Sequence, residues 1–187
     1  MKQLLSLLLC LSIIVPSMAK KEQRKQNVFP DGTPISEWFL QTKVVHPDSL
    51  GKKYDLSDYG IESNPHIVQT QKIQKIIDEA AANGGGVIYI PEGIYKSGSL
   101  FFKQGTHLYL SKGATLLGSE NIMDFPLLMT RIEGEYCKYF GALINADGLD
   151  TFTISGKGTI DGNGTPYWKA FRLRREWNPQ CTNKDEM

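Results

Sequence analysis

Two stretches of this chain repeat each other: Thr106-His-Leu-Tyr-Leu-Ser-Lys-Gly-Ala-Thr-Leu-Leu-Gly118 and Asp150-Thr-Phe-Thr-Ile-Ser-Gly-Lys-Gly-Thr-Ile-Asp-Gly162. Aligned at an offset of 44 residues (150 against 106), they share a serine, a threonine and a glycine, and their apolar residues keep one register. A spacing of 44 is two periods of about 22, which is typical of proteins built from stacked β-repeats. We therefore predict that the two stretches occupy equivalent positions in such a stack, two turns apart.

Short apolar segments alternate with glycines from residue 84 to residue 164. The segments 87–90, 93–102, 108–110 and 115–117 each stop at or near a proline or glycine. Tight antiparallel hairpins favour Asn-Gly or Asp-Gly turns, and residues 87–118 contain neither pair. Stacked parallel turns explain both the glycine corners and the repeat. The sequence therefore predicts an all-β solenoid with strands roughly 4.8 Å apart.

One amphipathic helix is predicted before these strands, over about residues 65–83. Asn64 followed by Pro65 is typical of a helix start, and the glycines at 84–86 are typical of a helix end. Between them, apolar residues recur at helical spacing: Ile73, Ile76, Ile77, Ala80 and Ala81. Because the open edge of a solenoid invites pairing with other chains, we expect this helix to cap the first turn.

The N-terminal segment is predicted to be a signal peptide over residues 1–19. Lys2 precedes an apolar run, and Ser17-Met18-Ala19 has the pattern of a cleavage site. The run is too short to span a bilayer comfortably, although an anchor that stays attached is the alternative. Residues 20–53 are interpreted as an extended, Pro-containing lead-in, and residues 54–187 as the N-terminal part of the solenoid. The predicted location is secreted or periplasmic.

Charge and cysteine content exclude several classes of partner. The chain has 21 basic and 20 acidic residues, and losing Lys2 with the signal peptide leaves 20 of each. A neutral chain gives no electrostatic reason to expect nucleic acid or an anionic membrane as partner. Cys137 and Cys181 remain after cleavage, and both a disulfide and two free thiols stay open. Without a Cys-x-x-Cys motif, and with scattered histidines, no metal or cofactor site is predicted.

Four segments together carry a resemblance to a known family. They are Tyr54-Asp-Leu-Ser-Asp-Tyr-Gly60, Gln71-Lys-Ile-Gln-Lys-Ile-Ile-Asp78, Gly85-Gly-Val-Ile-Tyr-Ile-Pro-Glu-Gly-Ile-Tyr95 and Gly156-Lys-Gly-Thr-Ile-Asp-Gly-Asn-Gly164. Over roughly residues 54–177 the chain resembles glycoside hydrolase family 28, the polygalacturonases, which belong to the pectin-lyase-like right-handed β-helix superfamily. The first three segments are shared with tailspikes and lyases. Arg131-Ile-Glu-Gly134, combined with residues 158–162 and Trp168, looks more specific for the hydrolases.

The resemblance implies inverting hydrolysis of pectin, a galacturonic-acid-containing polysaccharide. In such enzymes one carboxyl group protonates the leaving oxygen, while carboxylates on the other face activate water across about 6.5–9.5 Å. The family supplies these groups from an Asn-x-Asp motif and an Asp-Asp pair, beside a Gly-His-Gly histidine and an Arg-x-Lys pair. We expect none of the four motifs in this chain and assign it no catalytic residue. Later turns beyond residue 187 would carry them, so that the chain alone is inactive.

Residues 119–141 interrupt the repeat and are expected to form a loop that leaves the stack, where binding residues concentrate. Arg131 presents a fork suited to a uronate carboxylate. Glu133 lies beside it in sequence, and a solvated ion pair explains both residues equally well. Trp168 either stacks on a sugar ring or packs outside a turn. Arg131, Glu133 and Trp168 are the predicted substrate contacts, whereas Asp161 is predicted to be a turn residue.

Two other functions remain open from the sequence. The first is a non-catalytic β-helix used for attachment or carbohydrate binding, as in tailspikes and adhesins. The second is a polysaccharide lyase of the same superfamily. A lyase would need a basic catalytic residue and usually calcium-binding carboxylates, and the chain shows no acidic cluster suggestive of calcium. The hydrolase therefore remains the main hypothesis, with pectic polysaccharide as the expected partner.

Overall fold

The computed structural model describes residues 27–40 and 44–177, with side chains described up to residue 173. The chain divides into two compact units, residues 1–42 and 43–187. The predicted signal peptide at 1–19 and Cys181 lie outside the described residues. In the first unit, the 3-10 helix η1 (Glu37–Leu40) places the rings of Trp38 and Phe39 in a stack, with centroids 3.7 Å apart.

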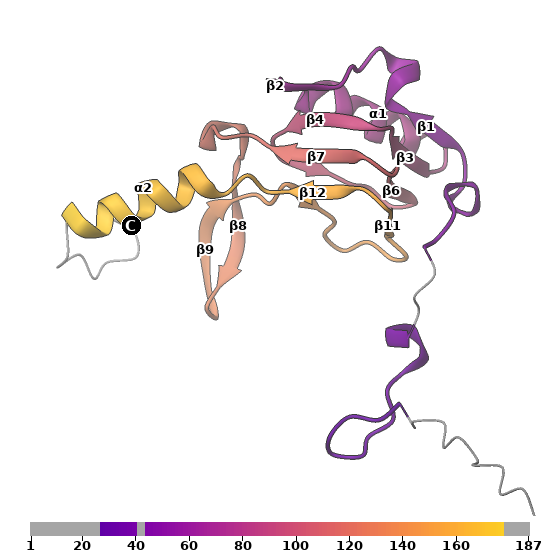
Figure 1. Ribbon diagram of the computed structural model, residues 1–187, viewed down its shortest axis with the longest axis horizontal. Helices are drawn as coiled ribbons and strands as arrows, with labels where there is room; N and C mark the ends of the chain where they lie inside the picture. The colour runs from indigo at the N-terminus through magenta and orange to yellow at the C-terminus, as the bar shows by residue number, and fades with distance from the viewer. Residues whose placement is uncertain (1–26, 41–43, 178–187) are drawn as a thin grey trace, which may run out of the picture. The chain divides into compact units, whose positions relative to one another are not determined.

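Parallel strands dominate the second unit and form three sheets. The first sheet contains, in order, β1 (Lys53–Asp55), β3 (Gly86–Ile90), β6 (Thr106–Leu110) and β11 (Ile154–Gly156). The second contains β2 (Asn64–Val68), β4 (Gly93–Ser97), β7 (Ala114–Gly118) and β12 (Thr159–Asp161), and the third pairs β5 (Leu100–Phe101) with β10 (Ile144–Asn145). Figure 1 shows β4, β7 and β12 side by side. The prediction of stacked parallel strands is confirmed.

The spacing between adjacent turns is about 20 residues where nothing interrupts it. Gly86 pairs with Thr106 and Gly93 with Ala114, which are offsets of 20 and 21. Leu116 pairs directly with Ile160, an offset of 44. The 44-residue repeat therefore joins neighbouring turns, and the prediction that it joins turns two apart is wrong. The extra length is the segment 119–141, which leaves the stack between β7 and β10.

In strand β11 the predicted alignment is wrong by two residues, because Ile154 pairs with Leu108 instead of Leu110. The corner after β11 is shorter than the corner after β6, and Gly156 makes it possible. Gly156 has a φ of +105°, and a Cβ atom there would collide with the carbonyl oxygen of Leu110. A shift of two residues leaves each side chain on its original face, so the apolar pattern survives.

Helix α1 spans Thr70–Ala82, so the predicted start at residue 65 is wrong. Residues 64–68 form β2, which pairs with β4. The side chain of Asn64 does accept hydrogen bonds from the backbone N–H groups of His66 and Ile67, at 2.8 and 3.2 Å. This turn leads into a strand because Ile67 and Val68, both β-branched, favour extended backbone.

The apolar stripe of α1 packs against β3, β5 and β6, and four of its residues are buried: Ile73, Ile76, Ile77 and Ala80. Gln74 binds the backbone of β5. Its side-chain oxygen accepts the N–H of Phe101 at 2.8 Å, and its amide group donates to the carbonyl of Phe101 at 2.9 Å. The Gln74 side chain thus satisfies the two backbone groups that a further strand would pair. The 3-10 helices η2 (Pro47–Leu50) and η3 (Leu56–Tyr59) flank β1.

Inward-facing side chains of successive turns form one core. Its strand residues include Tyr54, Ile88, Ile90, Tyr95, Leu100, Leu108, Leu110, Ala114 and Leu116. Leu108 and Leu116 are 0% exposed, whereas their partners in the last turn, Ile154 and Ile160, are 46% and 43% exposed. The apolar ladders therefore reach solvent at β11 and β12.

Residues 119–141 form a short 3-10 helix, η4 (Ile122–Asp124), and an antiparallel hairpin of β8 (Leu127–Ile132) and β9 (Glu135–Phe140). The segment leaves the stack as predicted, but it contains a regular hairpin where a loop was expected. A second helix, α2 (Thr165–Trp177), follows β12 in a segment for which no helix was predicted. Figure 1 shows the hairpin and α2 projecting from the sheets. No helix in the described part of the chain is long and apolar enough to cross a membrane.

Candidate functional site

The hairpin is anchored where it leaves β7. Ser119, which is 1% exposed, donates its hydroxyl to the carboxylate of Asp124 and accepts the backbone N–H of Asn121 at 3.1 Å on the same oxygen. The backbone N–H of Ser119 donates to the carbonyl of Ser97 at 2.9 Å. These contacts fix η4 against the end of β4.

The two ends of the hairpin are held together at its base. The backbone N–H of Gly141 donates to the carbonyl of Pro126 at 2.8 Å, and the backbone N–H of Ser99 donates to the carbonyl of Asp124 at 3.2 Å. Gly98 allows this approach, because a Cβ atom there would collide with the carbonyl oxygen of Asp124. The hairpin therefore has a fixed origin on the parallel sheets.

Helix α2 is positioned by the turn that follows β12. Asp161 accepts the backbone N–H of Asn163 at 2.8 Å, and Asn163 donates its amide to the carbonyl of Gly118 at 3.1 Å. The prediction that Asp161 is a turn residue is confirmed. Tyr167, in the first turn of α2, donates its hydroxyl to the carbonyl of Ser119 at 2.5 Å. This bond joins α2 to the start of the hairpin segment.

A cavity of about 710 Å³ lies between the base of the hairpin, η4, the end of β12 and α2. We call it the hairpin–helix groove. Its lining is Glu120, Asn121, Ile122, Phe125, Tyr139, Phe140, Gly141, Leu143, Gly162, Pro166, Tyr167, Ala170 and Phe171. Aromatic rings from three elements converge there, and the rings of Phe125 and Tyr167 meet edge-to-face with centroids 6.3 Å apart. Concave sites that bind small molecules are lined in this way, by many apolar groups and a few polar ones.

Glu120 is the charged group of the groove, and Lys96 holds it. The Nζ of Lys96 lies 3.0 and 2.8 Å from the two carboxylate oxygens. The side chain of Lys96 is 8% exposed and that of Glu120 is 49% exposed, so the carboxylate lies on the solvent side. The hydrogen bond from Lys96 lowers the pKa of the Glu120 carboxyl below its ordinary value of 4.5. Burial raises the pKa of Tyr167, and the charges of Asp124 and Glu120 raise it further.

This arrangement can bind a ligand, but it does not supply acid catalysis. A glycosidase needs one carboxyl group that keeps its proton and a second that has lost it. Glu120 is ionised at neutral pH, and it is the one carboxylate among the described side chains that line the groove. Residues 27–40 and 44–173 contain no cluster of three or more His, Cys, Asp or Glu that could hold a metal ion.

The three predicted substrate contacts lie outside the lining of the groove. Arg131 is exposed on β8, near the hairpin tip, and its Nε donates to the carbonyl of Gly134 at 3.2 Å. Glu133 occupies the turn with a φ of +51°. Trp168 is 64% exposed on α2, with its ring edge-to-face to Phe171 at 6.1 Å. Arg131 and Glu133 thus both lie near the hairpin tip, two residues apart, whereas Trp168 lies on α2.

Sequence analysis missed the aromatic residues that line the groove, although two patterns point to them. Tyr167 and Phe171 are four residues apart and so share one face of a helix. Tyr139 and Phe140 end a strand that is hydrogen-bonded to the start of β8. Glu133 and Gly134 both have positive φ, as the two central residues of a tight hairpin turn require.

The expectation that the chain contains no Asn-x-Asp motif is wrong. Asn145-Ala146-Asp147 has the Asn-x-Asp spacing. In the structure Asn145 is the last residue of β10, and its amide group donates to the carbonyls of Leu100 and Ala142, at 3.1 and 2.7 Å. Its side-chain oxygen accepts the N–H of Ala142 at 3.1 Å. Three of the four hydrogen bonds that an Asn side chain can make are thus made to the backbone, so we assign Asn145 no catalytic role.

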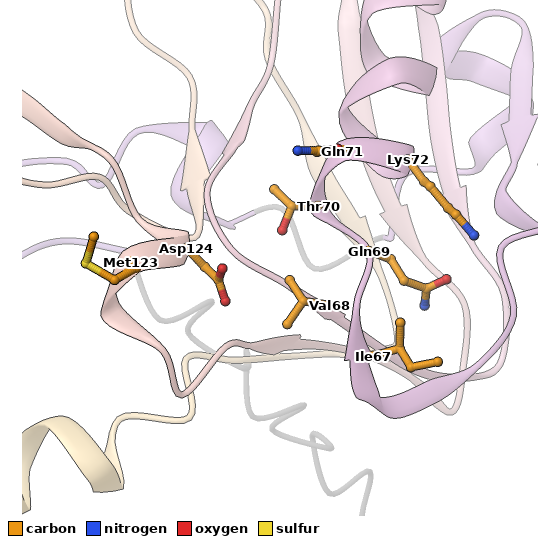
Figure 2. A pocket seen from close by; sticks show the side chains of 8 residues that line it. All are labelled: Ile67, Val68, Gln69, Thr70, Gln71, Lys72, Met123 and Asp124. Carbon is orange, nitrogen blue, oxygen red and sulfur yellow. The ribbon is translucent and has the colours of Figure 1, made fainter.

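A second cavity, of about 510 Å³, lies at the start of α1 (Figure 2). Figure 2 shows Asp124 opposite Val68 and Thr70. The carboxylate of Asp124 is already bonded to Ser119, and the hydroxyl of Thr70 accepts the N–H of Gly98 at 2.7 Å. These polar groups are already hydrogen-bonded within the protein, so the hairpin–helix groove is the better candidate site. Cys137, in β9, forms no disulfide with any residue that the structure describes, and Cys181 is not among these residues.

Comparisons with known proteins cover most of this chain but a small part of its relatives. No family profile matches the chain. The chain is 34% identical over 152 residues to an exo-poly-alpha-D-galacturonosidase of Dickeya chrysanthemi. The match covers 77% of this chain and 24% of that protein. The chain is also 37% identical over 129 residues to plasmin and fibronectin-binding protein A of Streptococcus pneumoniae. This match covers 67% of this chain and 17% of that protein. The chain thus spans about a quarter or less of these relatives.

A solved structure gives the same indication. The family 28 exopolygalacturonase of Yersinia enterocolitica is 33% identical, with a TM-score of 0.53, over 60% of this chain and 21% of that one. Over part of its length, therefore, this chain is similar to the family 28 polygalacturonases, as its motifs indicated.

Proposed function

We propose that this chain forms the first turns, and one wall of the substrate groove, of a glycoside hydrolase of family 28 type that degrades pectin. The observation that carries the proposal is the 34% identity to an exo-poly-alpha-D-galacturonosidase across 152 residues. A match that covers 77% of this chain includes roughly residues 44–144 wherever it begins, so it includes the first parallel strands and the hairpin. The activity is a glycosidase activity, and the substrate is a galacturonate-containing polysaccharide.

The parallel sheets support the finer description of the fold as a right-handed parallel β-helix. In this description α1 is the cap of the first turn, and Gln74 closes the edge of β5. The exposed Ile154 and Ile160 mark the turn onto which further turns would pack. We place the catalytic carboxylates on such turns, because no described residue of this chain forms the pair that inverting hydrolysis requires.

Substrate contacts on this chain would come from the hairpin and from α2. Arg131 lies directly opposite Tyr136 in the hairpin, and Tyr136 is 79% exposed. A guanidinium fork and an exposed ring side by side suit a uronate, since the fork binds the carboxylate and the ring packs on the sugar. Glu133 and Trp168 stay predicted contacts at the turn and on α2. The protein would work outside the cytoplasm, after loss of residues 1–19.

Binding of polygalacturonate to the purified chain tests this proposal. Replacing Arg131 with Gln should weaken binding about fivefold, as expected for the loss of roughly 1 kcal/mol from an exposed charge pair. Lys112→Gln is the matched control, because it removes one positive charge from an exposed corner between β6 and β7. Equal loss of affinity in both variants would show non-specific charge attraction and contradict a site at Arg131.

The absence of catalytic carboxylates has its own test. The purified chain should release no reducing ends from polygalacturonate above a blank. Release of reducing ends at a rate that increases with the protein concentration would overturn the placement of the catalytic groups on other turns.

A second function is favoured by one comparison. The Streptococcus pneumoniae relative is named for binding plasmin and fibronectin, and a non-catalytic attachment protein would need no carboxylate pair. If this alternative holds, the chain binds immobilised fibronectin or plasmin, and Arg131→Gln leaves the affinity for polygalacturonate unchanged.

A further inference from the structure

The described lining of the hairpin–helix groove carries one negative charge and no positive charge, although the protein is proposed to act on a polyanion. Its described lining contains aromatic, aliphatic and small residues, one amide and one carboxylate, but no Lys, Arg or His. A uronate carboxylate that entered the groove would therefore meet Glu120 and no cation to pair with.

The position of Lys96 does not change this conclusion. Lys96 is nearly buried beneath Glu120 and is absent from the lining, while both oxygens of Glu120 contact its Nζ. A ligand thus meets the carboxylate first. An ionised carboxylate only accepts hydrogen bonds, so Glu120 can receive the hydroxyl groups of a sugar but repels an acidic one.

The remaining walls suit an uncharged sugar ring. Phe125, Tyr139 and Phe140 offer ring surfaces to the C–H faces of a pyranose. The side-chain oxygen of Asn121 accepts the N–H of Met123 at 3.1 Å, which orients the amide group with its donors toward other partners. A donor from Asn121 and an acceptor from Glu120 match the hydroxyl groups of a sugar, which both donate and accept.

We infer that the hairpin–helix groove binds a sugar residue without a free carboxylate, either a methyl-esterified uronate or a neutral sugar, and that Glu120 excludes the free acid. This inference rests on the proposed function and assigns a different task to each part of the chain. Arg131 would meet the charged residues of a pectic chain, and the groove would hold an uncharged one.

The test compares three trisaccharides of equal length by calorimetric titration: trigalacturonate, its methyl ester and galactotriose. The full chain carries Arg131→Gln in every titration, so that the contact proposed for free uronates outside the groove is absent. The ester or the neutral sugar should bind about two- to threefold more tightly than the acid, because the nearer negative charge of Glu120 outweighs the positive charge of Lys96 behind it. Whichever of the methyl ester and galactotriose binds more tightly identifies the kind of uncharged sugar that the groove prefers. Added salt should reduce the difference, because it screens the repulsion.

Variants of the pair assign the effect to Glu120. Glu120→Gln should bring the affinity for the acid up to that for the ester. Because this change leaves Lys96 nearly buried without its partner, the double variant Lys96→Met/Glu120→Gln removes both charges and provides a second measurement. Glu62→Gln is the matched control, because Glu62 is exposed and lies outside the groove.

The outcomes separate this inference from the proposed function. If the acid binds as tightly as both the ester and the neutral sugar, or if both Glu120 variants still discriminate against the acid, the inference is wrong. In that case a fivefold effect of Arg131→Gln on polygalacturonate would still support the proposed function. Binding of none of the three sugars would overturn the inference and leave the groove without the proposed role.

Discussion

At the scale of single residues, Lys96 and Glu120 show what sequence analysis cannot detect. Lys96 pairs with Leu117 and follows the core residue Tyr95 in β4, so its side chain is on the outer face of the sheet. Lys96 is nevertheless only 6% exposed. Its burial depends on Glu120, which is 24 residues away and follows the end of β7. No local pattern links the two positions, because the ion pair exists only once β4 and β7 are neighbours.

The Lys96–Glu120 pair makes a pH-dependent contribution to stability. The hydrogen bond lowers the pKa of Glu120 in the folded state below 4.5, so the unfolded chain takes up the proton first as pH falls. The wild type should therefore be more stable than Glu120→Gln at neutral pH. The difference in the free energy of unfolding should shrink as pH drops below 4.5 and through the lowered pKa.

Urea denaturation between about pH 7 and about pH 3 measures this difference. In a Lys96→Met background the same Glu120→Gln change should give a difference that varies less with pH, because the largest cause of the lowered pKa is gone. A wild-type advantage that persists undiminished at the acid end would contradict the role given to Lys96.

At the scale of elements, the apolar stripe of α1 was predictable and its first residue was not. Ile73, Ile76 and Ile77 recur at helical spacing, and all three are buried. Asn64 and Pro65 have the residue types of a helix start, but the pairing of β2 with β4 takes those residues into a strand. Tertiary pairing thus overrides a local capping signal, which is the usual reason for an error at an element boundary.

Gln74 is predicted to contribute to stability through β5. Gln74→Ala removes both hydrogen bonds to the backbone of Phe101, and the loss should cost about 1–3 kcal/mol, because it leaves backbone groups without partners. Gln71→Ala, on the exposed side of the same helix, should change stability by less than about 0.5 kcal/mol. Chemical denaturation of both variants is the measurement, and equal effects would contradict the pairing of Gln74 with β5.

The hairpin was missed for a different reason. Its turn is Glu133-Gly134, and the strongest short-range signal for such turns is Asn-Gly or Asp-Gly. Both residues have positive φ, which Gly134 adopts freely and Glu133 adopts at a cost. The segment was correctly separated from the repeat, but its regular structure depends on cross-strand pairs that periodicity alone does not reveal.

At the scale of the second unit, the sequence correctly predicted which apolar residues of β7 and β12 lie in the same ladder. The repeat places Leu116 and Ile160 in the same ladder, and the structure pairs them. The number of turns between them was not predictable, because an inserted hairpin and an additional turn lengthen the chain by similar amounts. The groove was beyond sequence analysis too, since its lining comes from four elements that meet only after the turns have stacked.

The exposed end of the core should drive self-association. Ile160 is 43% exposed in β12, although its partner Leu116 is fully buried. Exposed apolar residues on an open sheet edge favour pairing between chains. Sedimentation velocity should therefore show species larger than a monomer as the protein concentration rises, and Ile160→Lys should shift them towards the monomer.

Thr159→Lys is the matched control for this experiment. Thr159 is exposed and adjacent to Ile160, but it lies on the other face of β12, since successive side chains of a strand alternate. A wild type that stays monomeric at all concentrations, or two variants that behave alike, would contradict the prediction.

The closed base of the hairpin has an evolutionary consequence. Because Pro126 and Gly141 are hydrogen-bonded at 2.8 Å, the chain returns to the sheets close to the point where it left them. A gene encoding a longer, shorter or unrelated segment between these residues would still produce the same scaffold. Recombination at this one site would then change what the protein recognises in a single event, without a prior round of compensating mutations in the core.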